Sequence, residues 1–577
     1  MNSSVCKPIC EITDEELSAA REKNLLDKGA RPVEKAESRG ESTPHRGRPA
    51  ARDKLLNELS RLDLKFGRDG EKILAKCPRL GHVETHVVGS SSFRRYLLVT
   101  AEAALISISR NGLDEVEDRL RARGFGPTTP TVKSYIRVAR DDRDDPALLL
   151  NIIIDTGRDD WLALHIGPGG MENIESTDPA APWFIRPAGF EPLAEPDFEG
   201  TDLSRLWQYI NIVDTKDRLL LLAWIVHTFR ASVPAPLLAF IGEQGGAKSS
   251  SCRAIRRIID PSAAPLLSLP RDERDLFSLI ECGHVLAFDN VSSLPDWLSD
   301  LFAAIVTGTG RIVRALYTDN EPRLFSAMRA LILNGISDFI VRGDLLDRAL
   351  ILAPPPISES KRKTESELSG TFEADLPAIL GGLYVLIARV ASTASSVHLE
   401  IKSRMADYCE TGEAVALALG HPSGYFGEIY SENTALSNDV ALDSSLVAGA
   451  VQKLHNKQNN WAGSPTDLLS ALGDEAGERS TASRRWPRIP SALTSELKRV
   501  APALRRAGIE VEFGRENKAR YVHIYTVQQE RPVVTVVTST PVQADLLESK
   551  TKAAQTPNSA GLSYYSMLEN GQELGLF

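Results

Sequence analysis

The chain has 577 residues, of which 42% are hydrophobic and 25% charged, and this composition is ordinary for a soluble protein of several domains. No apolar run reaches the ~18 residues of a membrane-spanning helix, and the N-terminal residues lack the apolar core of a signal peptide. We therefore expect a cytoplasmic protein with no membrane partner. The net charge of −10 argues against indiscriminate coating of DNA but says nothing about local basic patches.

The N-terminal part of the chain divides by composition. Residues 1–50 are polar and charged without periodicity, which predicts a disordered leader. Residues 51–200 form an N-terminal α+β region of unknown role. It begins with segments whose apolar residues follow a helical period. Short apolar runs between 135 and 167 follow, broken by glycine-containing turns, and they predict a small antiparallel sheet. The six cysteines are scattered and lack nearby histidines, which favours reduced thiols over a zinc site.

Residues 201–400 alternate helix patterns with four short apolar runs, LLAFI, HVLAF, RALILN and ALILAP. Strands that alternate with helices predict a parallel, three-layer α/β domain, and α/β is the fold class expected for the chain. Residues 401–460 are expected to be a helical connector and 461–530 another compact unit. The polar residues 531–577 are expected to be a flexible tail.

The segment PLLAFIGEQGGAKSS has the pattern of a phosphate-binding P-loop, because an apolar strand leads through a glycine-rich turn into a helix. Lys248 would reach the β- and γ-phosphates of ATP, and Ser249 would hold Mg²⁺. Ala247 departs from the usual glycine before the lysine, and glycine-rich turns also precede helices that bind nothing. The predicted nucleotide-binding residues are Gly242, Glu243, Gln244, Gly245, Gly246, Ala247, Lys248, Ser249 and Ser250.

Polar residues end the next two apolar strands. HVLAFDN ends in Asp289, 41 residues after Lys248, and its carboxylate suits the second position of a Mg²⁺ site, although an aspartate can also simply cap a strand. RALILN ends in Asn334, the type of residue that in ring ATPases lies between the two Mg²⁺-site strands and orients the attacking water.

Two further features follow the same strands. Arg348 could enter a neighbouring subunit's site as an arginine finger, or pair on the surface with Asp344 or Asp347; Arg342 competes for the finger role. Between the strands, TGTGRIVRALYTDNEPRLF predicts a basic hairpin for the DNA backbone, although such hairpins are usually just solvated. The hairpin residues predicted to contact DNA are Arg311 and Arg314.

These elements, in this order, resemble the superfamily 3 helicases, the AAA+ branch found in phage, plasmid and viral replication proteins. GEQGGAKSS is similar to their Walker A motif, HVLAFDN to Walker B, TGTGRIVRALYTD to the B′ hairpin and LILNGIS to motif C. The chain resembles still more closely the mobile-element proteins related to poxvirus-type primase-helicases, in which GEQGSAKS-like loops occur, so Ala247 fits that subfamily.

The resemblance implies a homo-hexameric motor on single-stranded or forked DNA, with ATP and Mg²⁺ as cofactors and a separate primase or polymerase as a possible partner. It implies catalytic roles for Lys248, Asp289, Asn334 and Arg348, with Ser249 and Asp289 on the metal. Two departures stand out. Asn290 replaces a second carboxylate found in many relatives, and the hairpin lacks their lysine-histidine pair.

The C-terminal unit predicts a winged helix. A helix capped by Ser464 or Thr466 is followed by a turn, an amphipathic helix and two strands around a Gly-Arg-Glu-Asn turn. Residues 484–520 hold ten Lys/Arg against four Glu, the charge contrast of a nucleic-acid face, although protein-docking winged helices exist. The residues predicted to contact DNA here are Arg484, Arg485, Lys498, Arg499, Arg505 and Arg506.

The sequence therefore predicts a P-loop ATPase that acts as a superfamily 3 type DNA helicase in replication of a mobile element or phage. The alternative is a DNA-binding AAA+ switch, such as an initiator, loader or defence regulator, that hydrolyses ATP without unwinding. Asn290 and the hairpin without a lysine-histidine pair favour this alternative. A DNA-binding protein with a degenerate nucleotide site, suggested by Ala247, also stays open.

Overall fold

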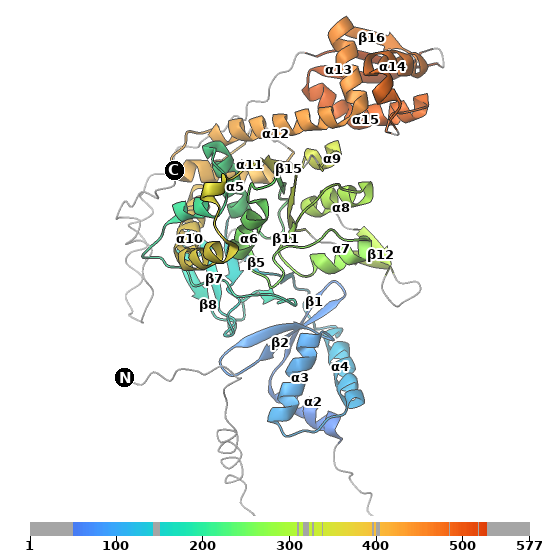
Figure 1. Cartoon of the computed structure of the whole chain (residues 1–577). Coiled ribbons are helices and arrows are strands. Elements are labelled where there is room, and N and C mark those ends of the chain that lie inside the picture. The colour runs from blue at the N-terminus through green and yellow to red at the C-terminus, as the bar shows by residue number, and fades with distance from the viewer. Residues whose placement is uncertain are drawn as a thin grey trace, which may run out of the picture.

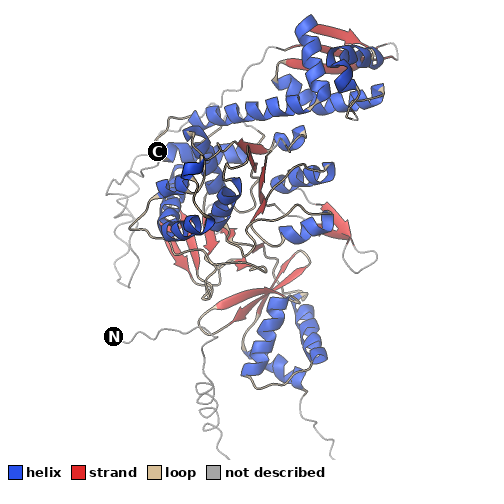
Figure 2. Ribbon diagram, viewed as in Figure 1, coloured by secondary structure: helices blue, strands red, loops and turns tan. Residues whose placement is uncertain are grey.

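The computed structural model shows a mixed α/β protein with several separate sheets (Figures 1 and 2). The structure describes residues 50–527, apart from 142–149, 309–310, 315–321, 326–327, 337–338, 395–396, 400–403, 484 and 517–518. The predicted leader, the predicted tail, Arg484 and the tip of the basic hairpin therefore lie outside the described residues.

The N-terminal unit is a three-stranded antiparallel sheet covered by three helices, at the blue end of the ribbon (Figure 1). Leu55, Phe93 and Val116, one from each helix, are buried in a core that this unit does not share with the other residues that the structure describes. The elements are α2 (Ala51–Arg61), β1 (Lys65–Asp69), β2 (Lys72–Pro78), β3 (Val83–Val87), α3 (Ser91–Ala103) and α4 (Arg110–Gly124).

A second antiparallel sheet, in the order β5-β6-β7-β8, follows and confirms the antiparallel pairing expected there. One face of it packs in a common core with helices α5, α10 and α11. The domain boundary expected at residue 200 therefore falls inside one hydrophobic core. The elements are β4 (Ser134–Tyr135), β5 (Val138–Arg140), β6 (Ile152–Asp155), β7 (Ala163–Gly167), β8 (Gly170–Ile174), β9 (Trp183–Phe184), η2 (Leu203–Gln208), α5 (Thr215–Thr228), α10 (Glu365–Thr393) and α11 (Ala406–Ala418).

Helix α10 is, within the described residues, long and apolar enough to cross a membrane by length and composition alone. In this fold 72% of its most apolar window is buried against the protein itself. A core helix of a soluble domain passes the same test, and the packing of α10 in the shared core accounts for its apolar character.

The central sheet is parallel, in the order β11-β14-β10-β15, as the alternating pattern predicts. Successive side chains of its strands enter two different cores: Leu238 and Phe240 face one, and Leu237 and Ala239 the other. Both faces are therefore covered, which is why these strands read as continuous apolar runs. The elements are β10 (Leu237–Ile241), α6 (Lys248–Ile259), α7 (Glu273–Ile280), β11 (Val285–Phe288), α8 (Asp296–Thr307), β12 (Arg311–Arg314), β13 (Pro322–Phe325), β14 (Ala330–Gly335), α9 (Gly343–Leu346), β15 (Ala349–Leu352) and η3 (Glu359–Lys361).

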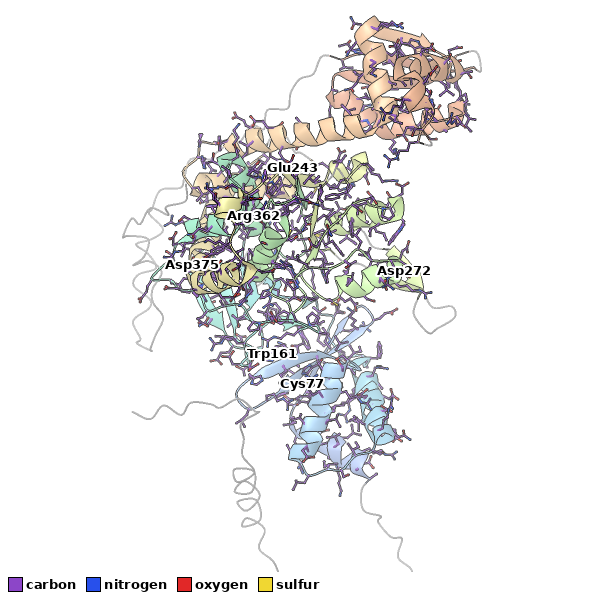
Figure 3. The ribbon with its side chains drawn as sticks, viewed as in Figure 1. Cys77, Trp161, Glu243, Asp272, Arg362 and Asp375 are labelled. Atoms are coloured by element: carbon purple, nitrogen blue, oxygen red, sulfur yellow. The ribbon has the colours of Figure 1, made fainter. Side chains whose placement is uncertain are left out.

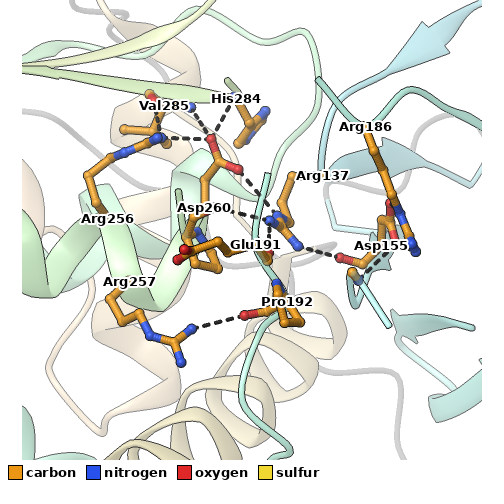
Figure 4. A network of polar contacts seen from close by, with 12 residues as sticks. Arg137, Asp155, Arg186, Glu191, Pro192, Arg256, Arg257, Asp260, His284 and Val285 are labelled. Carbon is orange, nitrogen blue, oxygen red and sulfur yellow. Dashed lines mark hydrogen bonds and ion pairs between the residues drawn. The ribbon is translucent and has the colours of Figure 1, made fainter. Parts of the chain in front are cut away.

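A buried polar network joins the antiparallel sheet to the central sheet (Figure 4). Asp260, just after α6, accepts hydrogen bonds from Arg137 Nε at 3.2 Å, from Arg256 Nη1 at 2.7 Å and from the backbone N–H of His284 at 2.7 Å. Burial alone would raise the pKa of Asp260, but Arg256 and Arg137 outweigh it and hold that pKa at about 2. The C-terminal end of α6 and the start of β11 are therefore held by one carboxylate.

The C-terminal unit lies at the end of the long helix α12 (Figure 1). Its helices and its three-stranded antiparallel sheet, in the order β16-β18-β17, follow the expected sequence of elements, but the sheet already includes residue 460 and α13 packs with α14. Gly514–Glu516, expected in a turn, belongs to β17. The elements are α12 (Tyr425–Ser444), α13 (Leu446–Gln458), β16 (Asn460–Gly463), α14 (Pro465–Thr481), α15 (Pro490–Arg506), β17 (Ile509–Glu516) and β18 (Ala519–Thr526).

Candidate nucleotide site and nucleic-acid interface

The glycine-rich loop connects the end of β10 to the first turn of α6, so its backbone N–H groups gather at a helix N-terminus. Two loop residues adopt the left-handed region: Gly245 at φ +83° and Ala247 at φ 54°. The position where the sequence departs from the usual glycine is therefore one where glycine would be the least strained residue. Ala247 occupies it with the conformation that the loop requires.

The segment between β15 and α10 packs directly against the glycine-rich loop. A Cβ placed on Gly246 would lie 3.0 Å from the carbonyl oxygen of Pro354, so a side chain there would force a shift. Asn211 Nδ2 donates to the carbonyl oxygens of Gly246, at 3.1 Å, and Pro355, at 2.7 Å. Asn211 and this covering segment were not anticipated, because nothing in their local sequence links them to the loop.

Lys248 is largely buried at the start of α6 and its ammonium group closes the loop. Its Nζ donates to the carbonyl oxygens of Gly242 at 2.8 Å and Glu243 at 2.6 Å. Burial lowers the pKa of Lys248, and the nearby Asp289 carboxylate opposes that effect. A phosphate that displaced the two carbonyl oxygens would satisfy the same ammonium group with a full negative charge.

Ser249 and Asp289 meet across the sheet edge. Ser249 Oγ donates to Asp289 Oδ1 at 2.7 Å, although the residues are 40 positions apart. A hydroxyl and a carboxylate, completed by phosphate oxygens and water, suit Mg²⁺. The described residues contain no group of three or more His, Cys, Asp or Glu side chains for a metal ion, so protein ligands alone do not complete such a site.

Asn334 lies on β14, the strand between the one that leads to Ser249 and the one that leads to Asp289. Its strand β14 pairs with β11 on one side and β10 on the other, with Asn334 opposite Phe240. Its Oδ1 accepts from the backbone N–H of Asn290 at 3.1 Å, and its Nδ2 lies 3.4 Å from Cys252 Sγ on α6. The ends of three strands thus bring Asn334 beside the hydroxyl–carboxylate pair.

The other predicted nucleotide residues lie around this centre. Glu243 and Gln244 are exposed on the loop, and Ser250 is half-buried in the first turn of α6. Glu243 is labelled with the side chains in Figure 3. Asn290 is exposed and adopts φ 61° directly after the acidic strand end.

Arg348 lies at the opposite edge of the sheet. Its carbonyl oxygen accepts from the backbone N–H of Leu237, the first residue of β10, so about 15 Å of strand separates it from the glycine-rich loop of its own chain. Its guanidinium pairs with Asp344, one of the two surface partners considered from the sequence. Arg342 pairs with Asp300 at 2.6 Å. Neither arginine reaches the glycine-rich loop of the same chain.

The predicted DNA-contacting residues separate into two places. Arg311 and Arg314 lie on β12, which pairs with β13 as an antiparallel hairpin. In the C-terminal unit, Arg485 and Lys498 are exposed. Three arginines of α15 are held by carboxylates. The pairs are Arg499–Glu496 at 2.6 Å, Arg505–Glu510 at 2.5 Å and Arg506–Asp347 at 2.5 Å. The basic face is therefore partly neutralised in this conformation.

The fold and these contacts define a mixed α/β protein with a glycine-rich loop, a helix N-terminus and an acidic strand end at one sheet edge. Residues 203–423 match the family of the actinomycete integrative conjugative element replication protein, and residues 447–541 match the AICE RepA C-terminal domain. Together the matches identify the class of the chain as a replication protein of a mobile element.

Solved structures of the NrS-1 C-terminal region are also similar to the chain. The A form apo structure shares 10% identity at a TM-score of 0.35 and covers 83% of this chain and 98% of that chain. A further apo structure of the same region gives the same identity, score and coverage. A TM-score this low supports no conclusion about the fold. No curated protein matches the chain.

Proposed function

We propose that the protein is a P-loop ATPase that drives DNA unwinding during replication of a mobile element, as a superfamily 3 type helicase. The observation that carries the proposal is the convergence of Ser249, Asp289 and Asn334 beside Lys248 at the ends of three neighbouring strands. Phosphoryl transfer from ATP needs positioning and charge neutralisation more than covalent chemistry, and these are the groups that supply them.

Each residue has a distinct role in this proposal. Lys248 exchanges its two carbonyl partners for the terminal phosphates, and Ser249 and Asp289 hold the metal. Mg²⁺, when bound, neutralises charge that develops on the phosphate oxygens. The side-chain amide of Asn334 orients the attacking water. Its fixed bond to the Asn290 backbone keeps the amide in one orientation.

Arg348 acts on a neighbouring subunit in this proposal. It lies at the amino-terminal ends of the strands, opposite the end that carries its own glycine-rich loop. It can therefore complete only the site of another copy, as in a hexameric ring. To do so it must leave Asp344. The C-terminal unit, with its helix-strand-helix-helix-strand-strand order, acts as a winged helix that binds DNA.

The test is ATP hydrolysis by the purified chain with and without single-stranded DNA, beside Lys248→Ala and Arg348→Ala. We expect DNA to stimulate hydrolysis, and each variant to lose about a hundredfold or more in rate. Arg348→Ala should keep its affinity for ATP, because it leaves the loop of its own chain intact. Hydrolysis that is unaffected by Lys248→Ala would refute the proposal.

A second candidate is a DNA-binding ATPase switch that does not unwind. The exposed side chain of Asn290 favours it, because an amide stands where a second carboxylate would activate water. Strand displacement on a forked DNA substrate separates the two: ATP-dependent displacement supports the helicase. DNA-stimulated hydrolysis without displacement supports the switch.

A further inference from the structure

The segment after β15 crosses over the glycine-rich loop and is fixed to it at several points. The backbone N–H of Ile357 donates to the carbonyl oxygen of Gly245 at 3.0 Å. Asn211 bridges the loop and Pro355, as described above. Beyond the segment, Arg253 on α6 pairs at 3.0 Å with Glu365 in the first turn of α10. Both ends of the covering segment are thus tied to the nucleotide elements.

This segment carries Arg362 onto the loop. A Cβ placed on Gly245 would lie 3.0 Å from Nη2 of Arg362 and 3.8 Å from its Cζ, so the guanidinium lies directly against the glycine backbone. Arg362 is labelled in Figure 3. It is exposed, and within the described part of the chain its side chain forms no hydrogen bond or ion pair. The guanidinium therefore keeps its five donors for another group.

The charge balance of the loop makes such a group an anion. Lys248 supplies one positive charge at the loop, and Arg348 lies at the opposite, amino-terminal end of the strands. A second cation at the loop itself would face the phosphates that the loop is shaped to hold. Arginine also presents a fork that matches two phosphate oxygens.

We propose that Arg362 binds the terminal phosphates of the nucleotide held by its own P-loop. The inference rests on the proposed ATP site and adds a contact within the same chain, 114 residues beyond Lys248, distinct from the arginine of a neighbouring subunit. The covering segment then positions a phosphate-binding side chain as well as packing the loop.

The experiment is equilibrium binding of a fluorescent ATP analogue with Mg²⁺ to the full chain. The variants are Arg362→Ala, Arg362→Lys and Lys248→Ala, with Lys361→Ala and Lys363→Ala as matched controls. The controls remove the same charge from neighbouring exposed positions of the same segment. We expect Arg362→Ala to weaken binding about tenfold or more, as for loss of a charged hydrogen bond. Arg362→Lys should lose less, and the two controls should stay within about twofold of the wild type.

The outcomes separate this inference from the proposed function. Binding that Lys248→Ala abolishes, with Arg362→Ala equal to the two lysine controls, overturns the inference and leaves the ATP site standing. Absence of binding by the wild type, or binding unaffected by Lys248→Ala, overturns both. Thermal unfolding of each variant excludes misfolding, which is not expected for the substitutions at Lys361, Arg362 and Lys363 because these side chains are exposed.

Discussion

Ser249 Oγ donates a 2.7 Å hydrogen bond to Asp289 Oδ1, so the hydroxyl at the start of α6 and the carboxylate at the end of β11 are already in contact. The pair is brought together by the order of strands rather than by sequence spacing, since β14 intervenes between β10 and β11. A preformed pair needs little rearrangement to receive Mg²⁺, which prefers oxygen ligands and keeps several waters.

Replacing Ser249 by alanine should remove the Mg²⁺-dependent part of ATP affinity. We expect Ser249→Ala to bind ATP equally well with Mg²⁺ and with a chelator, whereas the wild type binds more tightly with Mg²⁺. Ser249→Thr, which keeps the hydroxyl that the proposed metal site needs at this position, should behave as the wild type. Calorimetric titration under both conditions measures the difference. A Mg²⁺ effect that survives in Ser249→Ala would contradict the assignment.

Ala247→Gly should stabilise the protein. The left-handed conformation of Ala247 costs about 1–2 kcal/mol, and the greater chain entropy of glycine in the unfolded state returns about half of that. We expect a gain of up to about 1 kcal/mol in the free energy of unfolding, measured by urea denaturation. Ala254→Gly, in the interior of the helix α6 that follows, is the control and should destabilise. The same sign for both substitutions would contradict the strain at Ala247.

Acidification should destabilise the core around α5. Burial lowers the pKa of His227 to about 3 and of His284 to about 4, so both stay neutral in the folded protein. In the unfolded chain they bind protons below about pH 6.5, so stability falls as the pH drops from that value towards 4.

The expected loss between pH 8 and pH 5 is about 2 kcal/mol for each histidine, and tryptophan fluorescence during urea unfolding at each pH measures it. His284→Gln retains a donor for the carbonyl oxygen of Thr228, to which His284 Nε2 lies at 2.6 Å, and should reduce the pH dependence. An unchanged pH dependence in His284→Gln would show that His284 does not contribute.

Arg506 should fix the C-terminal unit to the central α/β domain, whereas Arg505 should not. Arg506 pairs with Asp347, next to α9, but Arg505 pairs with Glu510 inside the C-terminal unit. We expect Arg506→Ala to speed hydrogen exchange in α9 (Gly343–Leu346) by a few-fold, because a partly exposed pair is worth less than about 1 kcal/mol. Arg505→Ala is the matched control. Equal exchange in the two variants would show that the Arg506 contact does not hold the units together.

Local patterns in the sequence located most of the elements that form the candidate site. The apolar runs that end in Ile241 and Asp289 are strands or strand ends, and the capped start at Ser464 begins α14, because capping and apolar periodicity act over a few residues. The domain boundaries were harder to predict from the sequence. The antiparallel sheet shares a core with helices hundreds of residues away, and no local pattern records that packing.

The sequence by itself determined that a glycine-rich loop joins a buried strand to a helix with Lys248 and Ser249 in its first turn. Only the tertiary structure decided which distant groups meet there. Strand order placed Asn334 between β10 and β11 and Arg348 at the opposite end of the strands, and the segment after β15 brings Arg362 against Gly245. Strand and loop formation follow from local chain chemistry, whereas these contacts depend on long-range pairing, whose partners sequence spacing does not specify.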